Sequence, residues 1–199
     1  SPASYVFMWF PRGQDNSAPV QSDPVTLGAG MGARYENILS GVFGAEPPAI
    51  GAVGISSSNS ADLIVNSRTY NVPTAKVSGT FGQAIPGVQE DMLIPTGEKK
   101  RIIFMSENDD FRANLGCISG TGTNTRINVE LFDDTGASLE STFMDLGPWS
   151  NNQLNQVFGD HAPTNGYADV WTTTEGAAIY CYGSVVDNGS NDPTTILPQ

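Results

Sequence analysis

Residues 37–53 recur in outline at residues 152–168, and this repeat indicates the architecture. The first segment reads NILSGVFGAEPPAIGAV and the second reads NQLNQVFGDHAPTNGYA. Shifting residues 31–65 by 115 positions aligns the two copies without a gap. The identical pairs are Gly32/Gly147, Asn37/Asn152, Leu39/Leu154, Val42/Val157, Phe43/Phe158, Gly44/Gly159, Pro48/Pro163, Gly51/Gly166 and Ile64/Ile179. Upstream, Val6–Gly13 aligns with Val129–Gly136. This repeated order predicts an internal duplication.

The hydrophobic pattern around these copies is that of β-strands. Short runs rich in β-branched and aromatic residues are bounded by Gly, Asn, Asp or Pro, as strands commonly are. The runs are Tyr5–Phe10, Ala52–Ile55, Leu63–Tyr70, Arg101–Met105, Leu115–Ser119, Ile127–Phe132, Leu139–Met144, Tyr167–Thr173 and Ala178–Val186. We therefore predict an all-β fold with two related, antiparallel β-sandwich-like lobes.

Two segments carry apolar residues at helical spacing. They are Glu36–Phe43, with Leu39, Val42 and Phe43, and Asn151–Phe158, with the matching residues of the second copy. A spacing of i, i+3 and i+4 places such side chains on one face of a helix. One short helix is therefore expected in each lobe.

The two copies differ at their beginnings. The strand-like run Phe111–Ser119 precedes the second copy's strand Ile127–Phe132, and its counterpart in the first copy would lie before Ser1. We predict a first lobe at residues 1–71 that lacks its first strand, connecting strands at 72–106, and a second lobe with a C-terminal tail at 107–199. A sandwich that lacks a strand leaves backbone N–H and C=O groups unpaired, and another polypeptide is expected to fill the gap.

Composition excludes several classes of function. The 199 residues carry a net charge of −12, which argues against nucleic acid and anionic membrane surfaces as partners. No apolar run approaches the roughly 20 residues that span a bilayer. The only histidine, His161, lies in a Gly-Asp-His-Ala-Pro segment that reads as a surface loop. With no activated nucleophile or metal site apparent, we expect no enzyme.

The two cysteines, Cys117 and Cys181, each lie in a strand-like apolar run. A disulfide between adjacent strands is favoured over two buried free thiols, and it would indicate an oxidising compartment. Scarce lysine and a surface rich in Thr, Ser, Asn and Gly are also common in secreted β-proteins, so we predict an extracellular protein.

Two further features admit a binding role. The acidic segments 107–110 and 187–192 offer the oxygen ligands that Ca²⁺ takes, although solvated turns need the same residue types, and no cofactor is predicted. Tyr180 and Tyr182 lie on one face of a strand and are candidates for stacking on a glycan. The alternative is that such aromatic residues fill the core or its seam.

The motif order resembles tandem β-sandwich repeat modules found in large predicted secreted proteins of bacteria. The matching segments are Ser67–Asn71, Gly79–Pro86, Phe111–Gly116, Ser184–Asn188 and Asp192–Thr194. The resemblance implies a secreted, all-β, non-catalytic module with no settled activity.

These observations predict a structural subunit of an extracellular filament or surface assembly whose partners are copies of itself. The extended-prone tail residues Thr194, Thr195, Ile196 and Leu197 are the candidate inter-subunit strand, which would add to a neighbour's open sheet. The alternative is a glycan- or cell-surface-binding accessory module of a larger secreted protein.

Overall fold

The structure, a computed structural model, describes residues 1–58, 63–71 and 80–199. Its strands are β1 (Ala3–Pro11), β2 (Val20–Gln21), β3 (Val25–Leu27), β4 (Gly51–Ser57), β5 (Asn66–Asn71), β6 (Phe81–Pro86), β7 (Ile94–Pro95), β8 (Lys99–Met105), β9 (Phe111–Ser119), β10 (Thr125–Phe132), β11 (Ser138–Leu146), β12 (Asn151–Leu154), β13 (Gly166–Thr172), β14 (Ala178–Asp187) and β15 (Pro193–Ile196). One short α-helix, α1 (Ile38–Phe43), and 3₁₀ turns at Glu90–Met92 and Gly159–His161 complete the described elements. The predicted all-β class is confirmed.

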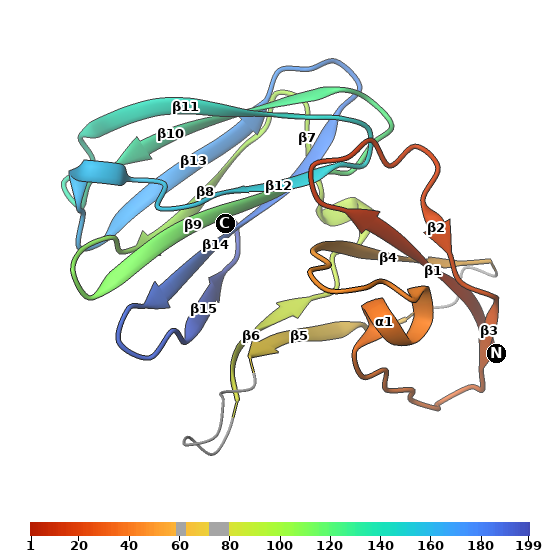
Figure 1. Ribbon diagram of the computed structural model, residues 1–199. Coiled ribbons are helices and arrows are strands. Elements are labelled where there is room, and N and C mark those ends of the chain that lie inside the picture. Colours follow the sequence, from red (N-terminus) through yellow and green to blue (C-terminus); the bar gives the residue numbers. More distant parts are fainter. Residues whose placement is uncertain (59–62, 72–79) are drawn as a thin grey trace.

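The C-terminal lobe is a β-sandwich of two antiparallel sheets (Figure 1). One sheet has the order β11-β10-β13-β8, and the other has the order β12-β9-β14-β15, with β7 also pairing with β14. Between them lies the main core, whose fully buried side chains include Ile102, Leu115, Val129, Phe158 and Ile179. Strands β7 and β8, which lie in the predicted connecting segment 72–106, pair with strands of this lobe.

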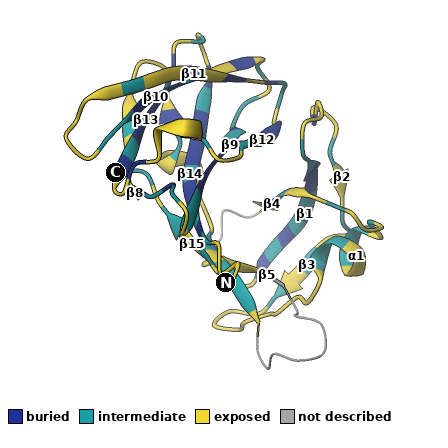
Figure 2. Cartoon of the chain, turned by 60° about the vertical axis from the view of Figure 1, so that its left-hand side comes forward, coloured by how far each residue is buried: buried dark blue, intermediate teal, exposed yellow. Residues whose placement is uncertain are grey.

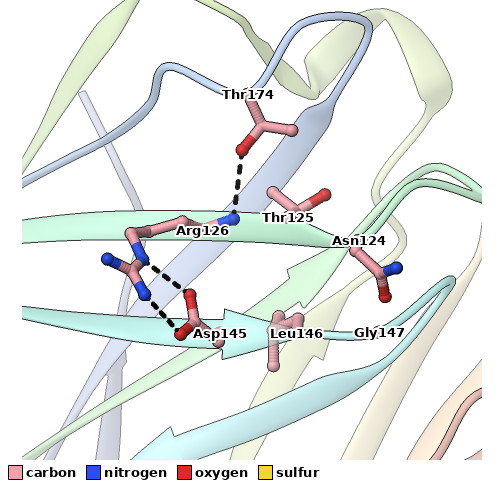
Figure 3. A pocket seen from close by; sticks show the side chains of 7 residues that line it. All are labelled: Asn124, Thr125, Arg126, Asp145, Leu146, Gly147 and Thr174. Carbon is pink, nitrogen blue, oxygen red and sulfur yellow. Dashed lines mark hydrogen bonds and ion pairs between the residues drawn. The ribbon is translucent and has the colours of Figure 1, made fainter.

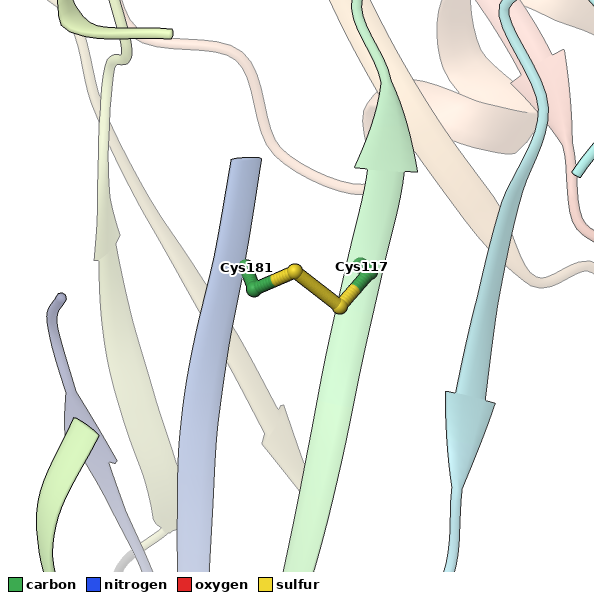
Figure 4. The surroundings of a disulfide bond; sticks show 2 residues. All are labelled: Cys117 and Cys181. Carbon is green, nitrogen blue, oxygen red and sulfur yellow. A yellow bond between two sulfur atoms is a disulfide. The ribbon is translucent and has the colours of Figure 1, made fainter. Parts of the chain in front are cut away.

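The predicted disulfide joins Cys117 of β9 to Cys181 of β14, as Figure 4 shows. The two residues face each other in the β9–β14 register, and their Cα atoms are 4.1 Å apart. Both side chains are buried in the core. The bond therefore ties together the two central strands of one sheet.

The N-terminal lobe repeats part of this arrangement. Strand β1 pairs with β4 on one side and with β2 and β3 on the other, as β10 pairs with β13 and β11. Phe7 lies opposite Ile55 in one lobe, and Val129 lies opposite Val170 in the other. The strand alignment is therefore one residue different from that predicted, with Phe7 rather than Val6 equivalent to Val129.

The hairpins that end the two lobes also correspond. Strand β5 pairs with β6 as β14 pairs with β15. Strands β8 and β9 have no counterpart among the described residues of the N-terminal lobe. Within the described residues, the N-terminal lobe therefore repeats neither of two strands that are consecutive in the C-terminal lobe.

The helix predicted at Glu36–Phe43 is present as α1, whereas the helix predicted at Asn151–Phe158 is wrong. Residues 151–154 form β12, which pairs with β9, and a turn follows. The N-terminal lobe offers no such partner strand in its described part, so its backbone groups bond locally: Gly41 N donates to Asn37 O and Gly44 N to Ser40 O. One apolar pattern therefore gives helix or strand according to whether a neighbouring strand is present.

Two sets of hydrogen bonds join the lobes. At one end, Gly13 N donates to Asn151 O, and Asn151 Nδ2 donates to Phe10 O, each at 2.9 Å. At the other end, the side-chain oxygen of Gln83 on β6 accepts from Ser184 and Thr195 on the outer face of the second sheet. The sequence pattern gave no signal for these contacts.

Asn16 is the central residue of the first junction. It is 4% exposed, and its Nδ2 lies within hydrogen-bond distance of the carbonyl oxygens of Pro11, Gln14 and Trp149. We expect Asn16→Ala to lower the free energy of unfolding by about 1–3 kcal/mol, because it leaves buried acceptors unpaired. Urea denaturation measures this, with the exposed neighbour Ser17→Ala as the matched control. Equal losses in the two variants would contradict the assignment.

Candidate functional site: the open side of the N-terminal lobe

Strand β5 has little cover in the described part of the molecule. Every side chain from Asn66 to Tyr70 is exposed, on both faces of the strand, whereas every residue of its counterpart β14 is buried or half-buried. Pairing with β6 occupies one edge of β5, and no described residue pairs with the other edge. A strand exposed on both faces and along one edge gains little from burial, so β5 has no second partner within the described residues.

Apolar side chains near β5 show the same deficiency. Ile64 is 96% exposed, whereas the equivalent Ile179 of the second copy is fully buried. Phe43 is half-buried on α1, whereas the equivalent Phe158 is fully buried. The repeated residues are identical, so the difference comes from what packs on them.

The second open edge belongs to β4. In the C-terminal lobe the equivalent strand, β13, lies between β10 and β8. Strand β4 pairs with β1, and nothing in the ranges that the structure covers pairs with the other edge of its residues 51–56. The two uncovered edges, of β4 and β5, are the positions that β8 and β9 fill in the second lobe. We call this pair of edges the open side.

The core behind the open side is small and aromatic. Among the described residues its buried members are Ala3, Tyr5 and Phe7 of β1. Figure 2 shows the contrast between this single buried stripe and the extensively buried C-terminal sandwich. The Tyr5 hydroxyl lies 2.8 Å from that of Tyr35, and burial with this hydrogen bond raises the pKa of Tyr5 to about 12. The large rings of Tyr5 and Phe7 thus partly fill a core that the described residues leave uncovered on one side.

The predicted inter-subunit strand lies within its own chain. Pro193–Ile196 forms β15 and pairs with β14, and Gln199 exchanges two backbone hydrogen bonds with Arg101 of β8. Thr194, Thr195, Ile196 and Leu197 would therefore have to leave this sheet before they could pair with a neighbour.

The predicted glycan-facing pair is largely covered by the protein. Tyr180 is 8% exposed, and Tyr182 is half-buried with its ring across Gly116, where an added Cβ would lie 2.5 Å from the ring. Burial raises the pKa of Tyr182, and the charge of Arg12 offsets part of this effect. This burial argues against a stacking platform and favours the seam alternative.

The two acidic segments lie side by side at the end of the β9–β14 pair. Asn188 N donates to Asp110 O, and Asn188 Nδ2 donates to Asp109 O. Arg112 donates to the side chains of Asn188 and Asn191. No group of three or more His, Cys, Asp or Glu residues in the described ranges is arranged to hold a metal ion.

Glu107 belongs to the same region but is buried, at 5% exposed. Its Oε2 accepts hydrogen bonds from the backbone N–H groups of Ala113 and Phe158. Burial raises the pKa of its carboxyl group above the ordinary value of 4.5, although these hydrogen bonds oppose the rise. The side chain links β9 to the turn after β12 and so has a structural role.

The raised pKa of Glu107 predicts a pH dependence. Since the folded state holds this proton more tightly than the unfolded state, the stability that protonation contributes is complete below about 4.5, the unfolded value. It is lost as the pH rises through the folded pKa. Wild type should therefore lose stability relative to Glu107→Gln as the pH rises from 4 to 7, in urea denaturation. The exposed Glu175→Gln is the control, and parallel curves for Glu107→Gln and wild type would contradict this prediction.

One shallow hollow on the surface of the C-terminal lobe is lined by charged side chains that pair with each other. It has a volume of ≈ 430 Å³ and lies between the ends of β10, β11 and β13 (Figure 3). Arg126 makes two hydrogen bonds of 2.7 Å to Asp145, and its backbone N–H donates to Thr174. His161, 3.7 Å from Glu140, lies outside it. This paired arrangement offers no unsatisfied charge to a ligand.

No helix in the described ranges has the length and apolarity needed to cross a membrane. No protein-family model matches the chain, and neither the curated proteins nor the solved structures include a significant match. The candidate site therefore rests on the comparison of the chain's own two lobes, and that comparison identifies the open side.

Proposed function

We propose that the protein is a non-catalytic structural subunit of an extracellular assembly, in which the open side of one copy is completed by an extended segment of a second copy. The observation that supports this most is the exposure of Ile64, whose equivalent in the complete lobe is fully buried. Burying such a side chain contributes about 1.5–3 kcal/mol, and the unpaired edges add backbone hydrogen bonds.

The geometry of such a contact favours a filament. The open side lies in the N-terminal lobe, and the C-terminal lobe has a complete sandwich, so the donating and accepting surfaces differ. A contact between two different surfaces repeats from subunit to subunit and gives an open chain unless the rotation closes a ring.

The extracellular location is supported by the disulfide, which persists in oxidising compartments. The net charge of −12 makes copies repel one another at low ionic strength. Assembly is therefore expected to be faster in 0.5 M salt than in about 10 mM salt.

The alternative function, a glycan- or surface-binding accessory module, has less support. Of its candidate residues, Tyr180 is buried and Tyr182 is half-buried with its ring against Gly116. Glycan-array binding that Tyr182→Ala abolishes would favour it over the filament.

Electron microscopy and sedimentation velocity of the purified 199-residue chain test the proposal. We expect fibres for wild type and for Met92→Lys, which changes an exposed apolar residue far from β5 in the sequence. Ile64→Lys should remain monomeric, because a charge would be buried at the open side. Monomers at high concentration for all three proteins, or fibres of Ile64→Lys equal to wild type, would overturn the proposal.

A further inference from the structure

We infer that the hollow between the ends of β10, β11 and β13 binds a neutral sugar, which it holds by the hydroxyl groups of one terminal ring. The inference goes beyond the proposed function, because the hollow lies in the C-terminal lobe and shares no residue with the open side. The sheet order explains why polar groups meet there. Strand β10 begins at this end of the sheet and the antiparallel strands β11 and β13 end at it, so three chain segments bring side chains to one place.

Two uncharged side chains in the hollow have hydrogen-bonding capacity that no described residue uses. The exposed amide of Asn124 makes no side-chain hydrogen bond within the described ranges, so it offers two N–H donors and a carbonyl acceptor. Thr174 Oγ1 accepts a hydrogen bond of 3.2 Å from Arg126 N, and its own proton has no acceptor in the part of the chain that the structure covers. These groups fit a ligand that both donates and accepts hydrogen bonds.

The ion pair in the hollow also has unused hydrogen-bonding capacity. Arg126 donates to Asp145 through Nε and Nη2, at 2.7 Å each, and no described residue bonds to its Nη1. Each carboxylate oxygen of Asp145 accepts one of these bonds and has a further lone pair. One hydroxyl group can therefore donate to the carboxylate while a neighbouring hydroxyl group accepts from the guanidinium. Figure 3 shows this pair on one side of the hollow and Asn124 on the other.

The charges of the site select a neutral ligand. The pair of Arg126 and Asp145 has no net charge and the whole chain carries −12, so an anionic ligand is repelled. A cation would have to compete with Arg126, whose hydrogen bonds lower the pKa of Asp145. A pyranose sugar carries hydroxyl groups on adjacent carbon atoms, and these satisfy the donors and the acceptors of the hollow together.

An exposed aromatic ring next to the ion pair offers an apolar contact. Phe143 lies two residues before Asp145 on β11, so both side chains project from the same face of the strand. The ring is 51% exposed, and the guanidinium carbon of Arg126 lies 4.0 Å from its centre. Small-molecule sites commonly combine aromatic surface with a few placed polar groups. The C–H groups of a pyranose ring fit the exposed part of Phe143.

The size of the hollow limits the ligand and its affinity. The volume of ≈ 430 Å³ lies within the range of about 300–1,000 Å³ for small-molecule sites. Because the hollow is shallow, a bound sugar stays partly in water, and we expect a Kd of about 1–10 mM for one terminal ring. Many copies in one assembly would strengthen this binding through multivalency, a consequence that rests on the proposed function, whereas the binding itself does not.

A glycan array tests the inference with the 199-residue chain, which is biotinylated through an added tag and held on tetrameric streptavidin so that binding does not depend on assembly. We expect binding to glycans that end in a neutral pyranose and not to those that end in a carboxylated or sulfated sugar. Asn124→Ala and Thr174→Val should each lower the apparent affinity about tenfold, the effect of losing one hydrogen bond to the ligand. Asn165→Ala removes an exposed amide at the other end of β13 and should bind as wild type does.

The outcomes separate this site from the other candidates. Asn124→Ala should keep the wild-type Tm, because its amide has no partner among the described residues, so its loss of binding cannot come from unfolding. No binding of wild type to neutral glycans, or binding that survives both Asn124→Ala and Thr174→Val, would overturn the inference. Binding confined to acidic glycans, or abolished by Tyr182→Ala, would also overturn it. Ile64→Lys should bind glycans as wild type does, whether or not wild type forms fibres, so failure of the filament proposal leaves this result unchanged.

Discussion

Phe158→Ala is expected to destabilise the C-terminal lobe by about 3–5 kcal/mol, the range for removing a fully buried aromatic side chain. Phe158 is 0% exposed and packs against Gly166, where an added Cβ would lie 2.8 Å from its ring. The equivalent Phe43→Ala is expected to cost only about 1–2 kcal/mol, because Phe43 is half-buried. Urea denaturation followed by lobe-specific hydrogen exchange measures both.

The Phe43 variant is the matched control for this prediction. Both residues end the same repeated motif, so equal costs would mean that the two lobes are equally complete.

Removing the disulfide is the second change with a large expected effect. Cys117→Ala with Cys181→Ala should lower the free energy of unfolding by about 4 kcal/mol, from the chain entropy of a loop with a sequence separation of 64. For a lobe of this size, that corresponds to a fall of about 10 °C or more in Tm. Differential scanning calorimetry measures the shift.

Reduction provides the control for the disulfide. Dithiothreitol should lower the Tm of wild type by a similar amount and leave that of the double variant unchanged. A double variant with the wild-type Tm would contradict this prediction, because it would mean that the disulfide adds no stability to the backbone pairing of β9 with β14. The bond lies within the complete lobe, so we expect little effect on exchange at β5.

Much of the strand content follows from local pattern. Tyr5–Phe10, Ile127–Phe132 and Ala178–Val186 are apolar runs between turn residues, and each is a strand. The disulfide was also predicted, because both cysteines lie in such runs. Local pattern succeeds where the neighbours of a strand agree with its own preference.

The predictions that differ from the structure have one cause, which is the effect of strands that are distant in the sequence. Residues 36–43 and 151–158 share their apolar spacing, yet one segment is helical and the other begins as a strand, because β9 is present in one lobe only. The pairing of β8 with β13 likewise depends on a distant strand, which the sequence of β8 does not specify.

The central claim is that the described N-terminal lobe repeats only part of the C-terminal sandwich, and that no described residue pairs with the second edge of β5. Native-state hydrogen exchange of the monomeric protein at low concentration tests it most directly, by comparing the amides of Asn66–Asn71 with those of their counterpart strand β14. The account predicts that the β5 amides exchange at least a hundredfold faster. Equal protection of β5 and β14 in the monomer would contradict it.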